Sequence, residues 1–82
     1  MITSAQIRAA RALLDWSRAD LSKNTGVGAS ALMRLESASG IPNGNIKTFE
    51  AVQSAFEAAG IEFIGSPDGG AGVRWRQTHL NK

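Results

Sequence analysis

The sequence predicts one small, mainly α-helical domain that ends in a β-hairpin. Apolar residues recur at helical spacing in four separate segments up to about residue 59. After Gly60 the period changes, and apolar and polar residues alternate as they do in strands. We expect a single domain from the 82 residues, because chains below roughly 100 residues already struggle to bury enough apolar surface.

The first two helices are predicted from capping-box patterns, in which a hydroxyl residue is followed three positions later by Gln or Asp. The two pairs are Thr3 with Gln6 and Ser17 with Asp20. The first pattern predicts a helix over about 4–15 and the second a helix over 18–25. Gly26 ends the second helix, because glycine readily takes the left-handed conformation found at helix C-termini.

Two further helices are expected after a short turn. A helical stripe runs over about 29–38, and the Gly-, Pro- and Asn-containing stretch 39–44 then predicts a loop. Asn45 is a suitable N-cap for a fourth helix over about 46–59, which Gly60 would end.

The C-terminal part is predicted to be a β-hairpin over 61–77. Residues 61–64 and 73–76 alternate as strands do, and the turn-rich segment 65–72 between them is expected to be a long, mobile loop. Residues 78–82 are expected to form a flexible tail.

Composition excludes several classes of protein. The chain contains no cysteine, so it has neither a disulfide framework nor a thiolate metal site. No apolar run approaches the roughly 20 residues that span a bilayer, and we expect a cytoplasmic location. The net charge of +2 is small. Its excess lies in residues 1–40, which is a weak indication of a polyanionic partner.

The sequence does not support catalysis. Its one histidine, His79, lies in the expected tail, and the carboxylates show no fixed spacing. The glycine-rich segment 65–72 lacks the lysine and the following helix of a phosphate loop. We therefore expect no enzyme, no cofactor and no metal site.

Residues 17–36 read SRADLSKNTGVGASALMRLE, with apolar and glycine residues at characteristic spacing. They are Leu21 in the first short helix, Gly26 and Val27 in the turn, and Leu32 and Leu35 in the second helix. This segment resembles the helix-turn-helix of the Xre/Cro/phage-repressor family, and the resemblance extends over about 7–63. It implies a four-helix lambda-repressor-like DNA-binding domain over residues 1–64, in which one helix enters the major groove of DNA.

The resemblance also implies which residues contact DNA. Base edges would be read by Ala29, Ser30, Met33 and Arg34, with Arg34 the best candidate to contact guanine. Because Ala29 and Met33 offer only apolar contact, part of the specificity is expected to come from DNA shape. The expected phosphate contacts, from side chains or from backbone N–H groups, are Ser17, Arg18, Lys23, Gly28, Asn43, Asn45 and Lys47.

Three residues depart from the family pattern. Arg18 stands where Gln is common, Ser22 where Ala is common, and Gly28 where Ser often caps the reading helix. The Ser22 hydroxyl is tolerable only if it bonds to a nearby carbonyl.

Arg11 and Glu36 match a further family feature, an ion pair between the first helix and the end of the reading helix. The alternative is two independent surface charges, worth under about 1 kcal/mol together.

A homodimer is expected because a two-stranded hairpin is marginal alone and its apolar face needs a cover. The single preceding helix is not expected to cover it, so the predicted dimer interface is Ile61, Phe63, Ile64, Val73 and Trp75. In the alternative, Trp75 folds onto the helix 46–59 of its own chain and the protein is a monomer.

The function expected from these features is a bacterial, sequence-specific transcriptional regulator. It would act as a repressor that binds double-stranded DNA at a near-palindromic operator. The alternative is a protein-binding module on the same fold, such as an antitoxin or an antiactivator that captures a toxin or another regulator.

Overall fold

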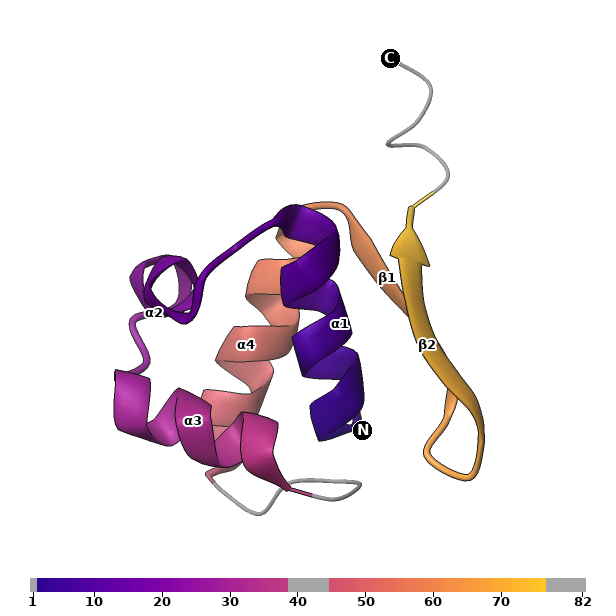
Figure 1. The fold of residues 1–82 in the computed structure, drawn as a ribbon, viewed down its shortest axis with the longest axis horizontal. Helices are drawn as coiled ribbons and strands as arrows, with labels where there is room; N and C mark the ends of the chain where they lie inside the picture. Colours follow the sequence, from indigo (N-terminus) through magenta and orange to yellow (C-terminus); the bar gives the residue numbers. More distant parts are fainter. Residues whose placement is uncertain (1, 39–44, 77–82) are drawn as a thin grey trace.

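The computed structural model describes residues 2–38 and 45–76, which form four helices and one antiparallel hairpin (Figure 1). The elements are α1 (Ser4–Leu14), α2 (Arg18–Thr25), α3 (Ala29–Ser37), α4 (Ile46–Ala58), β1 (Ile61–Ser66) and β2 (Gly69–Trp75). The predicted helices agree with these bounds to within one residue. No helix in the described part is long and apolar enough to cross a bilayer. The expected loop 39–44 and tail 78–82 lie outside the described residues.

The helix ends follow from side-chain caps close in sequence. In α1, Thr3 Oγ1 accepts a hydrogen bond from the Gln6 backbone N–H, and Gln6 Oε1 accepts one from the Thr3 N–H. Ser17 and Asp20 form the same reciprocal pair at α2. The predicted capping boxes are therefore both present, and they satisfy N–H groups that a helix start leaves without intrahelical partners.

The ends of α1 and α2 are both left-handed, although only one of them is glycine. Gly26 has φ 76° and its N–H donates to the Ser22 carbonyl, as expected of a glycine cap. Asp15 takes φ 57° at the end of α1, where no glycine predicts a left-handed cap. Short polar residues such as Asp tolerate this conformation better than most side chains do.

A single apolar core joins all the elements. Its fully buried side chains include Ile7 of α1, Leu21 of α2, Leu32 of α3, Phe56 of α4 and Ile61 of β1. The Trp16 and Phe56 rings are stacked with centroids 5.8 Å apart, and the Phe63 ring meets Phe56 edge-on at 6.1 Å. The helices thus pack around Phe56, which also holds the hairpin.

The segment 65–72 is not the long loop that the sequence predicted. β1 continues to Ser66 and β2 begins at Gly69, so only Pro67 and Asp68 form the turn. Gly65 and Gly70 adopt φ of 77° and 72°, and the pairing register shifts between Ile64 and Ser66. Glycines at positive φ therefore build a bulged ladder here, where their number alone had suggested an open loop.

The apolar face of the hairpin is covered within the subunit, contrary to the sequence-based expectation. Ile61 pairs with Trp75 and Phe63 with Val73, so these four side chains share one face. α4 packs against β1 and α1 against β2, and the hydrophobic residues of that face join the core. Two helices cover the face, not one, because α1, the first element of the chain, also packs against β2.

The predicted dimer interface is therefore wrong for Ile61, which is fully buried in its own subunit. Phe63, Val73 and Trp75 are partly buried against the same core. Ile64, which pairs with Gly72 across the strands, lies on the other face of the hairpin and is partly exposed. Of the five predicted interface residues, Ile64 is the one that this packing leaves on the outer face.

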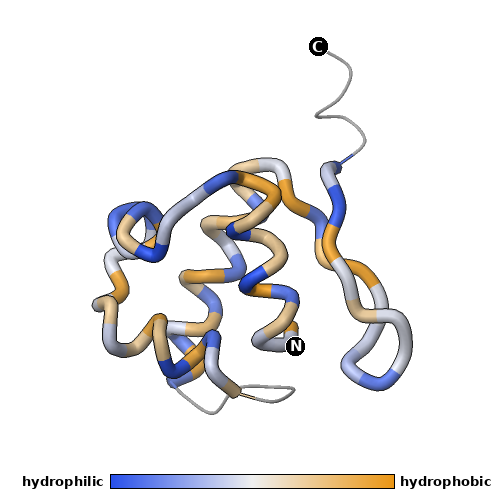
Figure 2. The backbone as a smooth tube through the Cα atoms, in the orientation of Figure 1, coloured by the Kyte–Doolittle hydropathy of each residue, from blue (hydrophilic) through white to orange (hydrophobic). Residues whose placement is uncertain are grey.

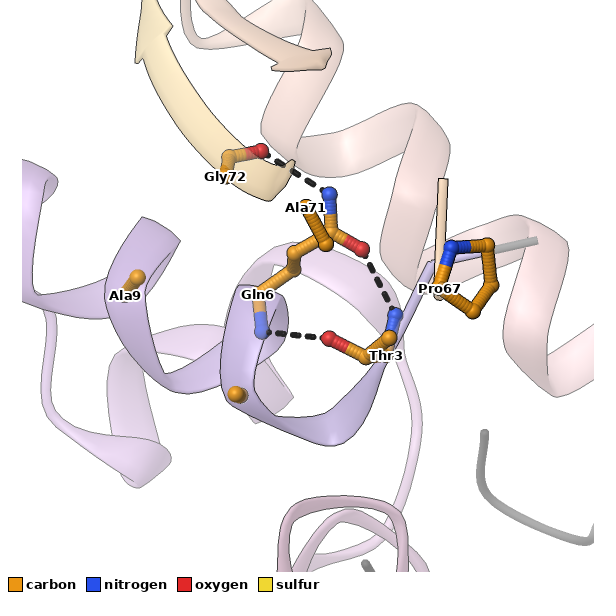
Figure 3. A pocket seen from close by; sticks show the side chains of 7 residues that line it. Thr3, Gln6, Ala9, Pro67, Ala71 and Gly72 are labelled. Atoms are coloured by element: carbon orange, nitrogen blue, oxygen red, sulfur yellow. Dashed lines mark hydrogen bonds between the residues drawn. The ribbon is translucent and has the colours of Figure 1, made fainter. Parts of the chain in front are cut away.

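Gln6 fastens the hairpin to α1, a role that sequence reasoning missed. Its Nε2 donates to the carbonyl oxygens of Ile64 (3.1 Å) and Gly72 (2.8 Å), one on each strand, while its Oε1 caps α1. Figure 3 shows the bonds of Gln6 to Gly72 and Thr3. Because Gln6 is buried and all these groups are paired, the amide links three backbone segments without an orphaned polar atom. The capping-box pattern predicted only the local half of these contacts.

We predict that Gly65→Ala destabilises the protein more than Gly70→Ala. Both glycines have positive φ, which an alanine adopts at a cost of about 1–2 kcal/mol. A Cβ at Gly65 would also overlap the Gly70 carbonyl, whereas a Cβ at Gly70 meets nothing within 4 Å. Urea unfolding should therefore show an additional loss of about 1 kcal/mol or more for Gly65→Ala. Equal losses would contradict this account of the bulge.

Candidate functional site

The α2–turn–α3 unit is held together by side chains on both sides of its turn. The Ser22 hydroxyl donates to the Val27 carbonyl at 2.7 Å, which is the nearby carbonyl that this hydroxyl required. Thr25 Oγ1 accepts from the Val27 N–H at 3.1 Å and donates to the Leu21 carbonyl at 2.8 Å. Sequence reasoning did not single out Thr25, although threonine in the last turn of a helix is a known local hydrogen-bonding signal.

One face of α3 is anchored in the core and the other is exposed. Leu32 and Leu35 are buried, whereas the four residues expected to read bases are exposed along the other side. These are Ala29, Ser30, Met33 and Arg34. Because Leu21, Leu32 and Leu35 are buried in one cluster that Val27 packs against, the outward face of α3 has a fixed orientation.

The exposed face of α3 is only weakly polar. Met33 is 51% exposed, and with Arg34, Ser37 and Ala38 it lines a shallow, mainly apolar hollow. The Ser37 hydroxyl donates to the Met33 carbonyl, so it is engaged within the helix. Arg34 supplies the only formal charge among the residues that line this hollow.

The residues expected to contact phosphates are mostly exposed, but several already have partners. Ser17 Oγ and Asn45 Oδ1 accept backbone N–H groups of α2 and α4, so both act as caps. Lys23 and Lys47 are exposed, and neither takes part in an ion pair between described residues. Gly28 starts α3 without a side-chain hydrogen bond. Asn43 lies outside the described residues.

α2 is the most hydrophilic helix of the fold, as its largely blue tube in Figure 2 shows. Its only buried residue is Leu21. At its N-terminus the pKa of Asp20 lies below its ordinary value, mainly because the carboxylate accepts the Ser17 backbone N–H and also interacts with the Ser17 hydroxyl. Asp20 is thus committed to the cap of α2 as a charged group.

The structure contains the Arg11–Glu36 ion pair that the family resemblance implied. Arg11 Nε lies 2.7 Å from Glu36 Oε2, and Arg11 Nη2 lies 3.0 Å from Oε1, so the contact is bidentate. Arg11 Nη1 also donates to the Trp16 carbonyl at 3.0 Å. The Glu36 side chain is 3% exposed and that of Arg11 22%, which makes this a largely buried pair and not two independent surface charges.

Arg18 shares the same carboxylate, which the sequence did not predict. Its Nη2 lies 3.1 Å and its Nε 3.4 Å from Glu36 Oε1, and its side chain is 38% exposed. Arg8 donates from Nη1 to the Glu36 backbone carbonyl. We call Arg8, Arg11, Arg18 and Glu36 the arginine cluster. Arg8 was missed, although its place three residues before Arg11 puts both on one face of α1.

The arginine cluster carries more positive than negative charge. The guanidinium groups of Arg11 and Arg18 meet the carboxylate of Glu36 and that of Arg8 its backbone carbonyl, and no other described carboxylate lies within 4 Å of these arginines. The other ion pair among the described residues, Arg74–Glu62, is on the hairpin and largely exposed. There the hydrogen bond from Arg74 lowers the pKa of Glu62. The unneutralised charge beside α2 and α3 makes this side of the molecule attractive to anions.

The described residues include no group of three His, Cys, Asp or Glu side chains that could hold a metal ion. Comparison with known proteins does not identify the site either. No protein-family model matches the chain, and no significant match exists among curated proteins. The geometry of α2, α3 and the arginine cluster is therefore the basis on which a function can be inferred.

We predict that Glu36→Ala destabilises the protein by about 3–5 kcal/mol, because it leaves the Arg11 guanidinium without its buried counter-ion. Arg18→Ala should cost under about 1 kcal/mol, since that side chain is more exposed and Arg11 still neutralises Glu36. Urea unfolding of both variants, with a double-mutant cycle between Arg11→Ala and Glu36→Ala, measures these energies. A cycle without coupling between Arg11 and Glu36 would show that the pair does not stabilise the fold.

Proposed function

We propose that this protein is a sequence-specific DNA-binding regulator that represses transcription by docking α3 in the major groove of a short operator. The observation that carries the proposal is the orientation of α3. Its buried face is anchored by Leu32 and Leu35, its other face presents exposed side chains, and Glu36 in its C-terminal turn bonds to the positively charged arginine cluster. A rigid helix with one exposed face is suited to the major groove, which is about 12 Å wide.

Base recognition in this proposal depends mainly on Arg34. An exposed arginine can make two parallel hydrogen bonds to guanine O6 and N7, and Ser30 can bond to several bases. Ala29 and Met33 supply apolar contacts, for example to a thymine methyl group. Since only two polar side chains reach the bases, the shape and deformability of the operator contribute to specificity.

Contacts to the DNA backbone would orient α3 in the groove. Lys23 at the end of α2 and Lys47 at the start of α4 are exposed cations without ion-pair partners among the described residues. Backbone N–H groups at the start of α3, where Gly28 provides no side-chain cap, supply further donors. These contacts set register and carry little sequence information.

We also propose that the regulator binds as a homodimer, with half-sites about 34 Å apart in a near-palindrome. The buried face of the hairpin is not the interface, because α1 and α4 cover it. The outer face of the hairpin carries Ile64, which does not belong to the core that α1 and α4 cover. A second hairpin packed against this outer face would bury Ile64.

A protein-binding module, such as an antitoxin, is a second candidate function on one specific observation. Met33 and Ile46 are 51% and 59% exposed, and the hollow beside Met33 is mainly apolar. Exposed apolar groups are characteristic of protein interfaces. The two functions differ in what α3 binds, so they respond differently to salt.

We predict that selection from a random DNA pool enriches a near-palindrome, and that affinity for it falls steeply with salt. If the dimer neutralises about eight phosphates, log K against log salt has a slope near −7. Fluorescence anisotropy at several salt concentrations measures it. A slope close to zero, or no enriched sequence, would overturn the proposal and favour the protein-binding module.

The matched variants for this experiment are Arg34→Ala and Arg74→Ala, which each remove one exposed arginine. Arg34→Ala should weaken binding to the selected sequence by about tenfold or more and relax the preference at one base pair. Arg74→Ala, on the hairpin, should weaken binding no more than the loss of one charge explains, and it should leave the base preference unchanged. Equal effects would contradict base reading by Arg34.

The dimer is tested by sedimentation equilibrium of the wild type beside Ile64→Ser. We predict that the wild type is dimeric at micromolar concentrations and that Ile64→Ser shifts the equilibrium toward monomer. Ile64 lies on the outer face, so this substitution should leave the core of the subunit folded. A wild type that remains monomeric contradicts the dimer, and a dimer insensitive to Ile64→Ser contradicts this interface.

A further inference from the structure

Arg18 contacts Glu36 through only one edge of its guanidinium group. Nε and Nη2 both bond to Glu36 Oε1, whereas Nη1 has no hydrogen-bond partner among the described residues. The side chain is 38% exposed, so water or a ligand reaches it. An arginine has five N–H groups in a rigid planar fork, and one edge can bind a carboxylate while the other binds a second anion.

Glu36 is a fixed point of attachment for Arg18. Its carboxylate is 3% exposed and both of its oxygens bond to Arg11, which in turn donates to the Trp16 carbonyl. Glu36 also belongs to α3, the helix that carries the exposed face described above. The bond from Arg18 to Glu36 therefore ties the start of α2 to the helix proposed to read DNA.

We propose that Glu36 is a positioning residue for Arg18, and that the Nη1 edge of Arg18, which Glu36 leaves unbonded, is a preorganised binding group for one phosphate. This inference rests on the proposed function, since it assigns the phosphate to the DNA backbone. A side chain already held in place loses less conformational freedom on binding than a flexible one. The excess of three guanidinium groups over one carboxylate keeps the cluster attractive to an anion.

The sign of the effect of Glu36→Gln distinguishes positioning from simple charge. Removing the carboxylate makes the protein more positive by one, so electrostatics alone predicts tighter binding to DNA. Loss of positioning predicts weaker binding, because a neutral amide holds the guanidinium less firmly. Glu50→Gln is the matched control, since Glu50 is exposed on α4 and forms no ion pair with a described residue.

The experiment measures affinity of the full chain for the selected duplex by fluorescence anisotropy, after urea unfolding has shown that each variant is folded. We expect Glu36→Gln to bind roughly tenfold more weakly than wild type, the loss of about one charge-assisted hydrogen bond. Glu50→Gln should bind as wild type or tighter. If Glu36→Gln binds as well as Glu50→Gln, the inference is overturned while the proposed function stands. If the wild type does not bind DNA, both are overturned.

Two variants of Arg18 keep the inference testable if Glu36→Gln does not fold. Arg18→Lys retains the charge but has no fork that can bridge two anions, so it should weaken binding nearly as much as Arg18→Gln. Arg18→Lys binding as wild type would overturn the inference. Inorganic phosphate at constant ionic strength tests whether this group binds phosphate in the DNA complex. Competition with the duplex that weakens in Arg18→Gln supports the inference, and equal competition in the wild type and Arg18→Gln would contradict it.

Discussion

The arrangement of the helices depends on one buried carboxylate. Glu36 is 3% exposed, and a charge removed from water is tolerable only when it is paired and hydrogen-bonded. Arg11 of α1 bonds to both of its oxygens and Arg18 of α2 adds a further contact, so the carboxylate joins three helices. Around it, the Arg8 guanidinium bonds to the Glu36 carbonyl and the Ser4 hydroxyl to the Leu35 carbonyl. The C-terminal turn of α3 thereby has partners that a helix end otherwise lacks.

The bonds around Glu36 fix the orientation of the exposed face of α3. With its C-terminal end bonded to α1 and its apolar side in the core, α3 has little freedom to turn. The side chains it presents are few and weakly polar, and the positive charge lies beside it in the arginine cluster. Shape and backbone contacts would therefore contribute much of the binding energy in the proposed DNA complex, and base contacts a smaller part. The same weak polarity explains why a protein partner is the competing function.

The hairpin shows where reasoning from periodicity stops. Of the five residues predicted for one interface, Ile61, Phe63, Val73 and Trp75 do share a face, whereas Ile64 lies on the other, because successive strand residues point to opposite sides. Alternation did not show what covers the shared face. α1, which begins almost 60 residues earlier in the chain, packs against β2, and its Gln6 bonds to both strands. A second subunit was expected only because the periodicity of the sequence does not indicate that α1 packs against β2.

What the sequence by itself determined is local. The capping boxes at Thr3 and Ser17 and the glycine at 26 involve partners within a few residues, so residue identity and spacing suffice to predict them. Apart from the Arg11–Glu36 pair, which the family resemblance implied, the tertiary structure decided which distant groups meet. Arg18 was expected to face phosphate alone and instead shares Glu36, and Ile61 was expected at an interface and is buried. The physical reason is that a long side chain can bond to several groups. The packing of the whole core decides which of these groups lie within hydrogen-bonding distance.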